Sequence, residues 1–178
     1  MADIVAVWEV SLSDGVHKVE FEHGTTSGMR IIRIDNKEIL RRNWMFKLVG
    51  REHFQIGKVK ASINIDASGG FSYEYSLEVN GKALKKFKEQ RKKSARVWTP
   101  VVDGHEFRIV LEKDSMDVWC NGQIVETAGV FVDDGSETHF TLSSGVACYI
   151  KNVSSGKKKE GIIHSLVIND NEIPEAVE

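Results

Sequence analysis

Hydrophobic and polar residues alternate along several stretches of the chain. The clearest is residues 71–81, FSYEYSLEVNG, where every second side chain from Phe71 to Val79 is apolar and the positions between them are Ser or Glu. This period of two predicts a β-strand with one buried face. The Asn80-Gly81 step at its end predicts a tight turn. Residues 17–23 and 107–112 alternate in the same way, so the pattern predicts short antiparallel strands.

Turn signals of the Asp-Gly and Asn-Gly type recur between the alternating stretches. They occur at Asp14-Gly15, Asp103-Gly104, Asn121-Gly122 and Asp134-Gly135. Short strands punctuated in this way are typical of an all-β sandwich or barrel. The helical signal is weak, because the best candidate, GKALKKFKEQRKK, offers only Leu84 and Phe87 as one turn of apolar surface, which is little to anchor a helix.

The two halves of the sequence resemble each other in order. Phe54 matches Phe140 at a shift of 86 residues, and Leu77 matches Leu166 at a shift of 89. The same alignment places His164 opposite Tyr75. Ordered matches of this kind indicate a tandem duplication of one β unit. A single larger sandwich is the alternative.

We therefore expect an all-β fold of two tandem, internally repeated antiparallel β-sandwich-like domains joined by a short basic linker. The expected boundaries are 1–88 for the N-terminal β domain, 89–97 for the basic linker and 98–178 for the C-terminal β-sandwich domain. Residues 85–96 contain seven basic residues and one acidic residue. Because like charges repel, this segment is expected to be extended and solvated.

Composition and charge place the chain among soluble globular proteins. Its net charge is −2, with 41% hydrophobic and 28% charged residues, so nothing favours nucleic acid as a partner. No apolar run reaches the roughly 18 residues of a membrane helix, and MADIVAVWEV has acidic residues where a secretory signal is positive. Two cysteines fit a reducing compartment, and we expect a cytoplasmic protein.

Candidate catalytic and metal-binding residues are few. His17 and His23 share one face of a predicted strand, but a catalytic zinc needs three protein ligands. Cys120 and Cys148 lack a CxxC pair or a glycine-rich elbow, so both are expected to be buried and inert, with an oxidisable surface thiol as the alternative. His164 is expected to be a core residue with one hydrogen bond.

His139 follows the acidic loop DDGSET, where a histidine-carboxylate pair is conceivable, and no phosphate-binding glycine motif occurs. We therefore expect no enzyme, no cofactor and no metal. We also expect no deep polar pocket with perturbed titrating groups beside any histidine or cysteine.

Two segments are candidates for binding a partner. NWMFKLVG contains Trp44 and Phe46, which are core residues or, if exposed, form an adhesive patch. The basic segment and the run 157–159 are either solvated or able to contact phosphates. The candidate interaction residues are Trp44, Phe46, Arg91, Lys92 and Lys93.

Six long segments carry a resemblance to a known family: SDGVHKVEFEHGTTSG, NWMFKLVG, FSYEYSLEVNGK, FRIVLEKDSMDVWCNG, FVDDGSETHF and SSGKKKEGIIHSLVIND. With them, about residues 3–176 of the chain resemble the Fas apoptotic inhibitory molecule family in its short form. The sequence begins without the N-terminal extension typical of the neuronal long form, so properties linked to that extension are not expected.

The resemblance implies a cytosolic, non-enzymatic protein that restrains apoptosis triggered by the death receptor Fas. It also implies links to neurite outgrowth, NF-κB signalling and protection against stress-induced aggregation, and a β-rich fold whose C-terminal half is an independent sandwich. The first hypothesis is an interaction module that binds signalling proteins of the death-receptor pathway. The alternative is a holdase-like protein that caps aggregation-prone clients by strand addition. No nucleic-acid or membrane partner is expected, and the chain is expected to be a monomer or weak homodimer.

Overall fold

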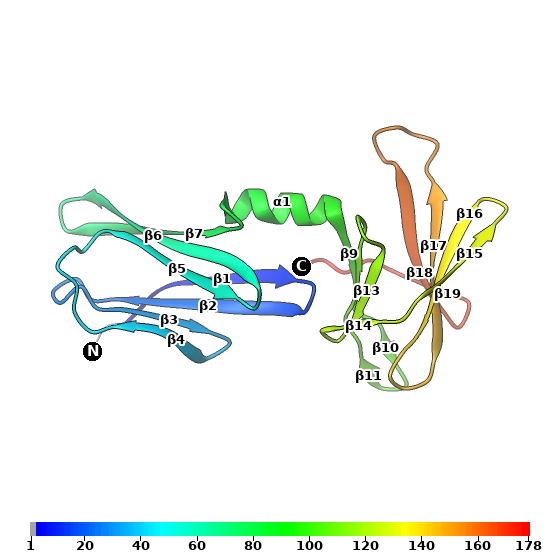
Figure 1. Ribbon diagram of the computed structural model, residues 1–178, viewed down its shortest axis with the longest axis horizontal. Helices are drawn as coiled ribbons and strands as arrows, with labels where there is room; N and C mark the ends of the chain where they lie inside the picture. The colour runs from blue at the N-terminus through cyan, green and yellow to red at the C-terminus, as the bar shows by residue number, and fades with distance from the viewer. Residues whose placement is uncertain (1–2) are drawn as a thin grey trace. The chain divides into compact units, whose positions relative to one another are not determined.

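The computed structural model describes residues 3–178, and the regular elements of this part are β-strands except for one short helix (Figure 1). The chain forms two compact units. The first comprises residues 3–12 and 16–91, and the second comprises residues 13–15 and 92–178. The predicted all-β class is confirmed.

The first unit contains two antiparallel sheets of four strands each, in which every strand pairs with the next along the chain. One sheet consists of β1 (Ile4–Leu12), β2 (Gly15–His23), β3 (Arg30–Ile34) and β4 (Lys37–Arg42), and the other of β5 (Gly50–Ile56), β6 (Val59–Gly69), β7 (Ser72–Val79) and β8 (Lys82–Ala83). One cluster of buried side chains draws on both sheets: Val10, Val19, Phe21, Ile32, Ile56, Ile63, Ile65, Leu77 and Val79. The two sheets therefore form a sandwich around a shared core.

The second unit contains a four-stranded sheet, a five-stranded sheet and a small two-stranded ribbon. The four-stranded sheet has the order β14 (Gln123–Val125), β13 (Asp117–Cys120), β12 (Ile109–Glu112), β9 (Ala95–Trp98). The five-stranded sheet is β15 (Ala128–Val132), β16 (Gly135–Thr141), β17 (Ala147–Ser154), β18 (Ile162–Ile168) and β19 (Asn171–Ile173), and the ribbon is β10 (Val101–Val102) with β11 (His105–Glu106). Both larger sheets contribute to one core, which includes Trp98, Ile109, Leu111, Phe140, Ile150 and Leu166.

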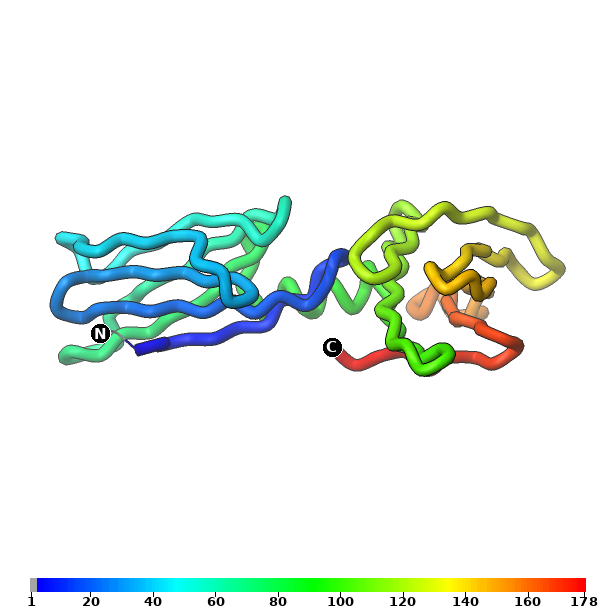
Figure 2. Tube along the Cα trace, turned by 90° about the horizontal axis from the view of Figure 1, so that it is seen from below, coloured from blue at the N-terminus to red at the C-terminus, as the bar shows by residue number. Residues whose placement is uncertain are grey.

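The chain end belongs to this second unit. After β19 the C-terminal residues run back toward β9 (Figure 2), and the Ala176 N–H donates a hydrogen bond of 2.8 Å to the Val97 carbonyl. The C-terminal residues are therefore attached to β9 of the same unit.

Topology agrees with the predicted duplication, because in each unit a four-stranded sheet precedes a meander of the following strands. In the second unit the β10–β11 ribbon interrupts the four-stranded sheet between β9 and β12. Equivalent turns adopt the same left-handed backbone conformation. Asn80, between β7 and β8, has a φ of 52°, and Asn169, between β18 and β19, has a φ of 51°. Asn36 and Asn121, which follow the third strand of their sheets, have φ values of 69° and 49°. Asparagine is one of the few residues other than glycine that tolerates this region.

The alternation over residues 71–79 is confirmed in part. β7 buries Leu77 and Val79 and leaves its Ser and Glu side chains more exposed. Phe71, expected on the buried face, is instead 99% exposed in the turn before the strand. The strand begins one residue later than the pattern indicates, so this aromatic residue lies outside the sandwich.

The basic segment is helical rather than extended, which corrects the sequence expectation. Helix α1 (Leu84–Ser94) covers most of it, and β9 follows directly. Phe87 is buried in the core of the first unit, and Leu84 packs beside it. One large buried side chain therefore anchors the helix, and the remaining Lys, Arg, Glu and Gln residues have high helix propensity. Among the described residues, no helix has the length and apolar character to cross a bilayer.

Candidate functional site

Residues 43–49, which join β4 to β5, present two aromatic side chains to solvent. We call this segment the aromatic loop. Trp44 is 65% exposed and Phe46 is 85% exposed. Their ring centroids lie 6.4 Å apart, with the planes tilted by 54°. The structure thus brings these two predicted interaction residues together on the surface, and Trp44 is not part of the core.

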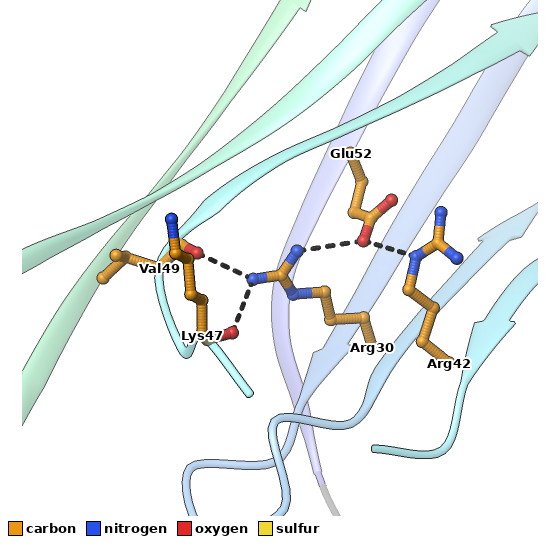
Figure 3. A network of polar contacts seen from close by, with 5 residues as sticks. All are labelled: Arg30, Arg42, Lys47, Val49 and Glu52. Carbon is orange, nitrogen blue, oxygen red and sulfur yellow. Dashed lines mark hydrogen bonds and ion pairs between the residues drawn. The ribbon is translucent and has the colours of Figure 1, made fainter. Parts of the chain in front are cut away.

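A buried arginine forms hydrogen bonds to the backbone of the aromatic loop. Arg30, on β3, is almost inaccessible to solvent. Its Nη2 donates hydrogen bonds to the carbonyl oxygens of Lys47, at 3.1 Å, and Val49, at 2.9 Å. Its Nη1 donates to Glu52 Oε1 at 2.9 Å. Figure 3 shows the guanidinium between the two loop carbonyls and the carboxylate, so one side chain connects β3, β5 and the loop.

Glu52 receives a second cation as well. Arg42 Nε donates to the same Oε1 at 2.7 Å. Burial on its own would raise the pKa of Glu52, but the hydrogen bonds from Arg42 and Arg30 outweigh it and leave the pKa below the ordinary value. The carboxylate is therefore ionised at neutral pH and balances the buried Arg30 charge.

The middle of the loop is attached separately. The Met45 N–H donates a hydrogen bond of 3.0 Å to the Ser27 carbonyl. The neighbouring Gly28 has a φ of +72°, and a Cβ at this position would collide with the Met45 carbonyl oxygen. Only glycine combines this backbone conformation with such a close approach. The aromatic loop is therefore fixed at Met45 as well as near its C-terminal end, which keeps Trp44 and Phe46 at the surface.

The two histidines on β2 do not form a metal site. His17 Nδ1 lies 2.7 Å from Asp35 Oδ2, whereas His23 is buried and its Nδ1 is hydrogen-bonded to the Tyr75 hydroxyl at 2.7 Å. Burial, followed by the nearby Arg30 charge, lowers the pKa of His23. Within residues 3–178, no group of three or more His, Cys, Asp or Glu side chains is placed to hold a metal ion.

Both cysteines are buried free thiols, as expected, which excludes the alternative of a surface thiol. Burial raises the pKa of Cys120. Burial, with a smaller contribution from Cys120, raises the pKa of Cys148 to about 11. Because the thiolate is the reactive form, both side chains are poor nucleophiles at neutral pH.

Two histidines of the second unit, His139 and His164, each have one polar side-chain partner. His139 Nε2 lies 3.0 Å from Glu137 Oε1, two residues away on the same face of β16. His164 Nδ1 donates a hydrogen bond of 2.6 Å to Asn152 Oδ1, which confirms the single hydrogen bond expected. The residue is only half-buried and lies outside the core cluster, so its expected place in the core is wrong. Burial, followed by the charges of Lys113 and Arg96, lowers the pKa of His164 to about 4.

The second unit contains an open hollow of about 590 Å³ beside His164. We call it the basic hollow. Its lining residues are Lys92, Lys93, Arg96, Lys113, Lys159, Glu160, Ile162, Ile163, His164 and Glu175. This hollow is open and partly apolar, so it is not the deep polar pocket that the prediction excluded, although it does place one titrating group with a lowered pKa, His164, in its lining. His164 is paired with an amide there and not with a carboxylate, so the arrangement is not a catalytic dyad.

The basic hollow includes two of the three basic residues predicted as candidates. Lys92 and Lys93 line it, whereas Arg91 is not among its lining residues. The hollow also contains Arg96, Lys113 and Ile162, which no pattern in the sequence connects with these lysines, because only the fold brings the segments together. Of the basic run 157–159, Lys159 is the residue that lines the hollow.

Comparison with known proteins identifies the family. The model of the family "Fas apoptotic inhibitory molecule (FAIM1)" matches residues 4–176. The chain is 64% identical over 177 residues to Fas apoptotic inhibitory molecule 1 of Homo sapiens, covering 98% of each chain. It is 63% identical over 177 residues to the Mus musculus protein of that name, again covering 98% of each. Identity to the Bos taurus protein is 63% over 180 residues, or 100% of this chain and 89% of the relative.

These findings first define the class: an all-β protein of two sandwich-like units that presents a fixed aromatic loop on one unit and a basic hollow on the other. A match over nearly the whole length then makes the assignment specific. The chain belongs to the Fas apoptotic inhibitory molecule family.

Proposed function

We propose that this protein is a non-enzymatic, cytoplasmic regulator that inhibits Fas-mediated apoptosis by binding a signalling protein of the death-receptor pathway. Its family supports the role, since relatives over 60% identical carry the name Fas apoptotic inhibitory molecule 1. The buried thiols with raised pKa values, Cys120 and Cys148, fit a regulator better than a thiol enzyme.

The observation that carries the binding mode is the exposed aromatic pair on the fixed loop. Trp is among the residues most enriched at binding hot spots, and large aromatic side chains supply much of the contact area. Burying one large apolar side chain contributes on the order of 1.5–3 kcal/mol. Because Arg30, Gly28 and Met45 already fix the loop, binding loses little conformational entropy there. We assign Trp44 and Phe46 as the contact residues.

A cell-death assay with matched variants tests this assignment. The protein is deleted from cells sensitive to Fas ligand, and the full chain is restored as wild type, as Trp44→Ala/Phe46→Ala or as Phe71→Ala. Phe71 is the control because it is 99% exposed in the same unit but lies in another turn. We expect the wild type and Phe71→Ala to rescue the cells and the double variant to fail at equal abundance. Rescue by the double variant would exclude the aromatic loop as the binding surface.

A second candidate function, a holdase-like role under stress, is favoured by one edge of the second unit. β15 is the outer strand of the five-stranded sheet, and its Phe131 side chain is 95% exposed, next to the half-exposed Val130. An outer strand with apolar side chains is a template for pairing with another strand. A client strand that adds to β15 would be kept from pairing with other clients.

The same cells separate the two functions when heat or oxidative stress is added. A lysine on the edge strand discourages strand addition, so Phe131→Lys should leave Fas-ligand rescue intact but increase insoluble aggregates under stress. Trp44→Ala/Phe46→Ala should show the reverse. If wild-type rescue appears only under stress, together with fewer aggregates, the holdase role is primary and the proposed Fas-specific interaction is wrong.

A further inference from the structure

The basic hollow gathers cations from separate parts of the second unit. Lys92 and Lys93 come from the last turn of α1, Arg96 from β9 and Lys113 from the turn after β12. Lys159 comes from the loop between β17 and β18, the long hairpin in Figure 1. Lysines at a helix C-terminus have a structural explanation, because they interact favourably with the helix dipole. That explanation does not cover Lys113 or Lys159, which are not on the helix.

Positive charge in the hollow is balanced only in part. Two carboxylates line it: Glu175, at 3.8 Å from Arg96 Nε, and Glu160, at 3.7 Å from Lys157 Nζ outside the hollow. Among residues 3–178, the ammonium groups of Lys92, Lys93, Lys113 and Lys159 have no ion pair or side-chain hydrogen bond. Four like charges on one concave surface repel one another, and a bound anion relieves that repulsion.

One wall of the hollow is a strand with an incomplete set of neighbours. β18 pairs with β17 along its whole length, from Ile162 to Ile168, but with β19 only from Leu166 to Ile168. A two-residue turn follows Ile168, so Ile168 and Asn171 form a hydrogen-bonded pair in which the backbone groups of Ile168 face β19. Along an antiparallel strand every second residue faces the same neighbour in this way. The N–H and C=O groups of Ile162 and His164 therefore face the side that β19 leaves open.

Side chains on this strand add apolar surface to the site. Ile162 and Ile163 are about half exposed and line the hollow together with His164. A compact oxyanion such as phosphate would use the lysines but neither the isoleucines nor the open strand edge. An extended peptide uses all three features, because its backbone pairs with the edge while alternate side chains meet the walls.

We propose that the basic hollow binds an acidic peptide segment of a partner protein, which adds as a short strand beside residues 162–165 of β18. Its Asp or Glu carboxylates lie against Lys92, Lys93, Lys113 and Lys159, and an apolar side chain between them packs on the exposed isoleucines. Charge complementarity sets the class of partner, and the open edge sets its conformation. This site lies in the second unit and does not depend on the aromatic loop.

The test uses the full chain and a labelled peptide. A fluorescein-tagged heptapeptide of alternating Glu and Val is titrated with the protein while fluorescence polarisation is measured, and a Lys-Val peptide of equal length is the negative probe. We expect saturable binding of the acidic peptide only, weakened at high salt because exposed ion pairs are screened. Hydrogen exchange at the Ile162 and His164 amides should slow when the peptide is bound.

Matched charge reversals locate the site. Lys92→Glu/Lys93→Glu should weaken binding by about tenfold or more, since two attractive pairs become repulsive. Lys85→Glu/Lys86→Glu makes the same change of charge on the same helix outside the hollow and should change the affinity by less than about twofold. Lys159→Glu should also lower the affinity for the acidic peptide. Because Lys159 lies on a loop, this effect cannot arise from a change in the stability of the helix.

Three results would overturn the proposal. If the Lys85/Lys86 and Lys92/Lys93 variants lose equal affinity for the acidic peptide, the peptide is attracted by the net charge of the protein and not by the hollow. Equal binding of the Lys-Val peptide would exclude recognition of acidic side chains. Displacement of the acidic peptide by pyrophosphate at similar concentration, with no slowing of exchange at Ile162 and His164, would identify a compact-anion site instead. The cell-death result with Trp44→Ala/Phe46→Ala changes none of these outcomes.

Discussion

Replacing Arg30 by methionine should destabilise the first unit by about 3–5 kcal/mol, the usual cost of removing one partner from a buried ion pair. Methionine retains an unbranched chain of similar length, so the loss is mainly of charge and hydrogen bonds. Glu52 retains only Arg42 as a cation, and the carbonyls of Lys47 and Val49 lose their donor. A fully buried acceptor left unsatisfied costs about 1–3 kcal/mol. The two loop carbonyls are only partly buried and cost less, so the expected range comes mainly from the nearly inaccessible Glu52 carboxylate, which loses one of its two cations.

A matched control is available one strand away. Arg41 forms an exposed ion pair with Glu38 three residues earlier, with Arg41 Nη2 at 2.7 Å from Oε1. Because exposed pairs contribute little, Arg41→Met should leave stability almost unchanged. The assay is native-state hydrogen exchange of the slowest amides of β6, which reports the first unit alone, since a chain of two units need not unfold in one step.

The expected pattern has a functional part. Arg30→Met should also speed exchange in the aromatic loop and weaken binding of any partner that contacts Trp44 and Phe46. If Arg30→Met costs no more than Arg41→Met, then solvent replaces the lost donors without penalty. The buried guanidinium would then not be what fixes the loop, and our account of why the aromatic pair stays at the surface would be wrong.

Three further predictions follow from the same contacts. Gly28→Ala should destabilise the first unit by about 1–3 kcal/mol, measured by urea unfolding, because its φ is +72° and a Cβ meets the Met45 carbonyl; an unchanged midpoint would contradict this. Cys120 and Cys148 should react with iodoacetamide at pH 7 only as fast as the protein unfolds, because burial raises both thiol pKa values; rapid labelling of the folded chain would refute it. Stability of the second unit should fall as the pH drops from about 6.5 toward 4, because the unfolded state then binds a proton that the folded His164, with its pKa lowered to about 4, does not. In His164→Gln the thermal-unfolding temperature should depend less on pH over that range. An unchanged dependence on pH would exclude this residue as the cause.

Local patterns predicted the strands well because the period of two is set by backbone geometry. The buried positions Leu77 and Val79 follow from that alternation. The helix α1 was missed because a single large side chain, Phe87, anchors it in a core that only the folded unit provides. Phe71 was misplaced for a related reason, since the turn between β6 and β7 extends one residue further than the pattern indicates.

Contacts between distant segments could not be predicted in the same way. Nothing in the sequence links Arg30 to Glu52 or to the carbonyls of Lys47 and Val49, because their proximity depends on how two sheets face each other. The hydrophobic character of the aromatic loop was visible, but its exposure was not. A run of basic residues does not indicate which other segments lie beside it in the fold. The sequence therefore does not predict that Lys92 and Lys159 share one surface.

The duplicated topology explains how one fold came to display two different surfaces. Tyr75 and His164 occupy matching positions on β7 and β18, and each makes one polar contact inside its unit, Tyr75 with His23 and His164 with Asn152. What differs is the surrounding chain. In the first unit an arginine on β3 holds an aromatic loop outward, whereas in the second the last turn of α1 and the hairpin loop bring lysines beside the open part of β18. Because Tyr75 packs against the core of the first unit whereas His164 is half-buried in the lining of the basic hollow, the same strand position serves different surroundings, and specificity can change in the loops without altering the sandwich. Variants of the aromatic loop and of the basic hollow are therefore independent probes, and a double variant should show the sum of their separate effects on folding free energy.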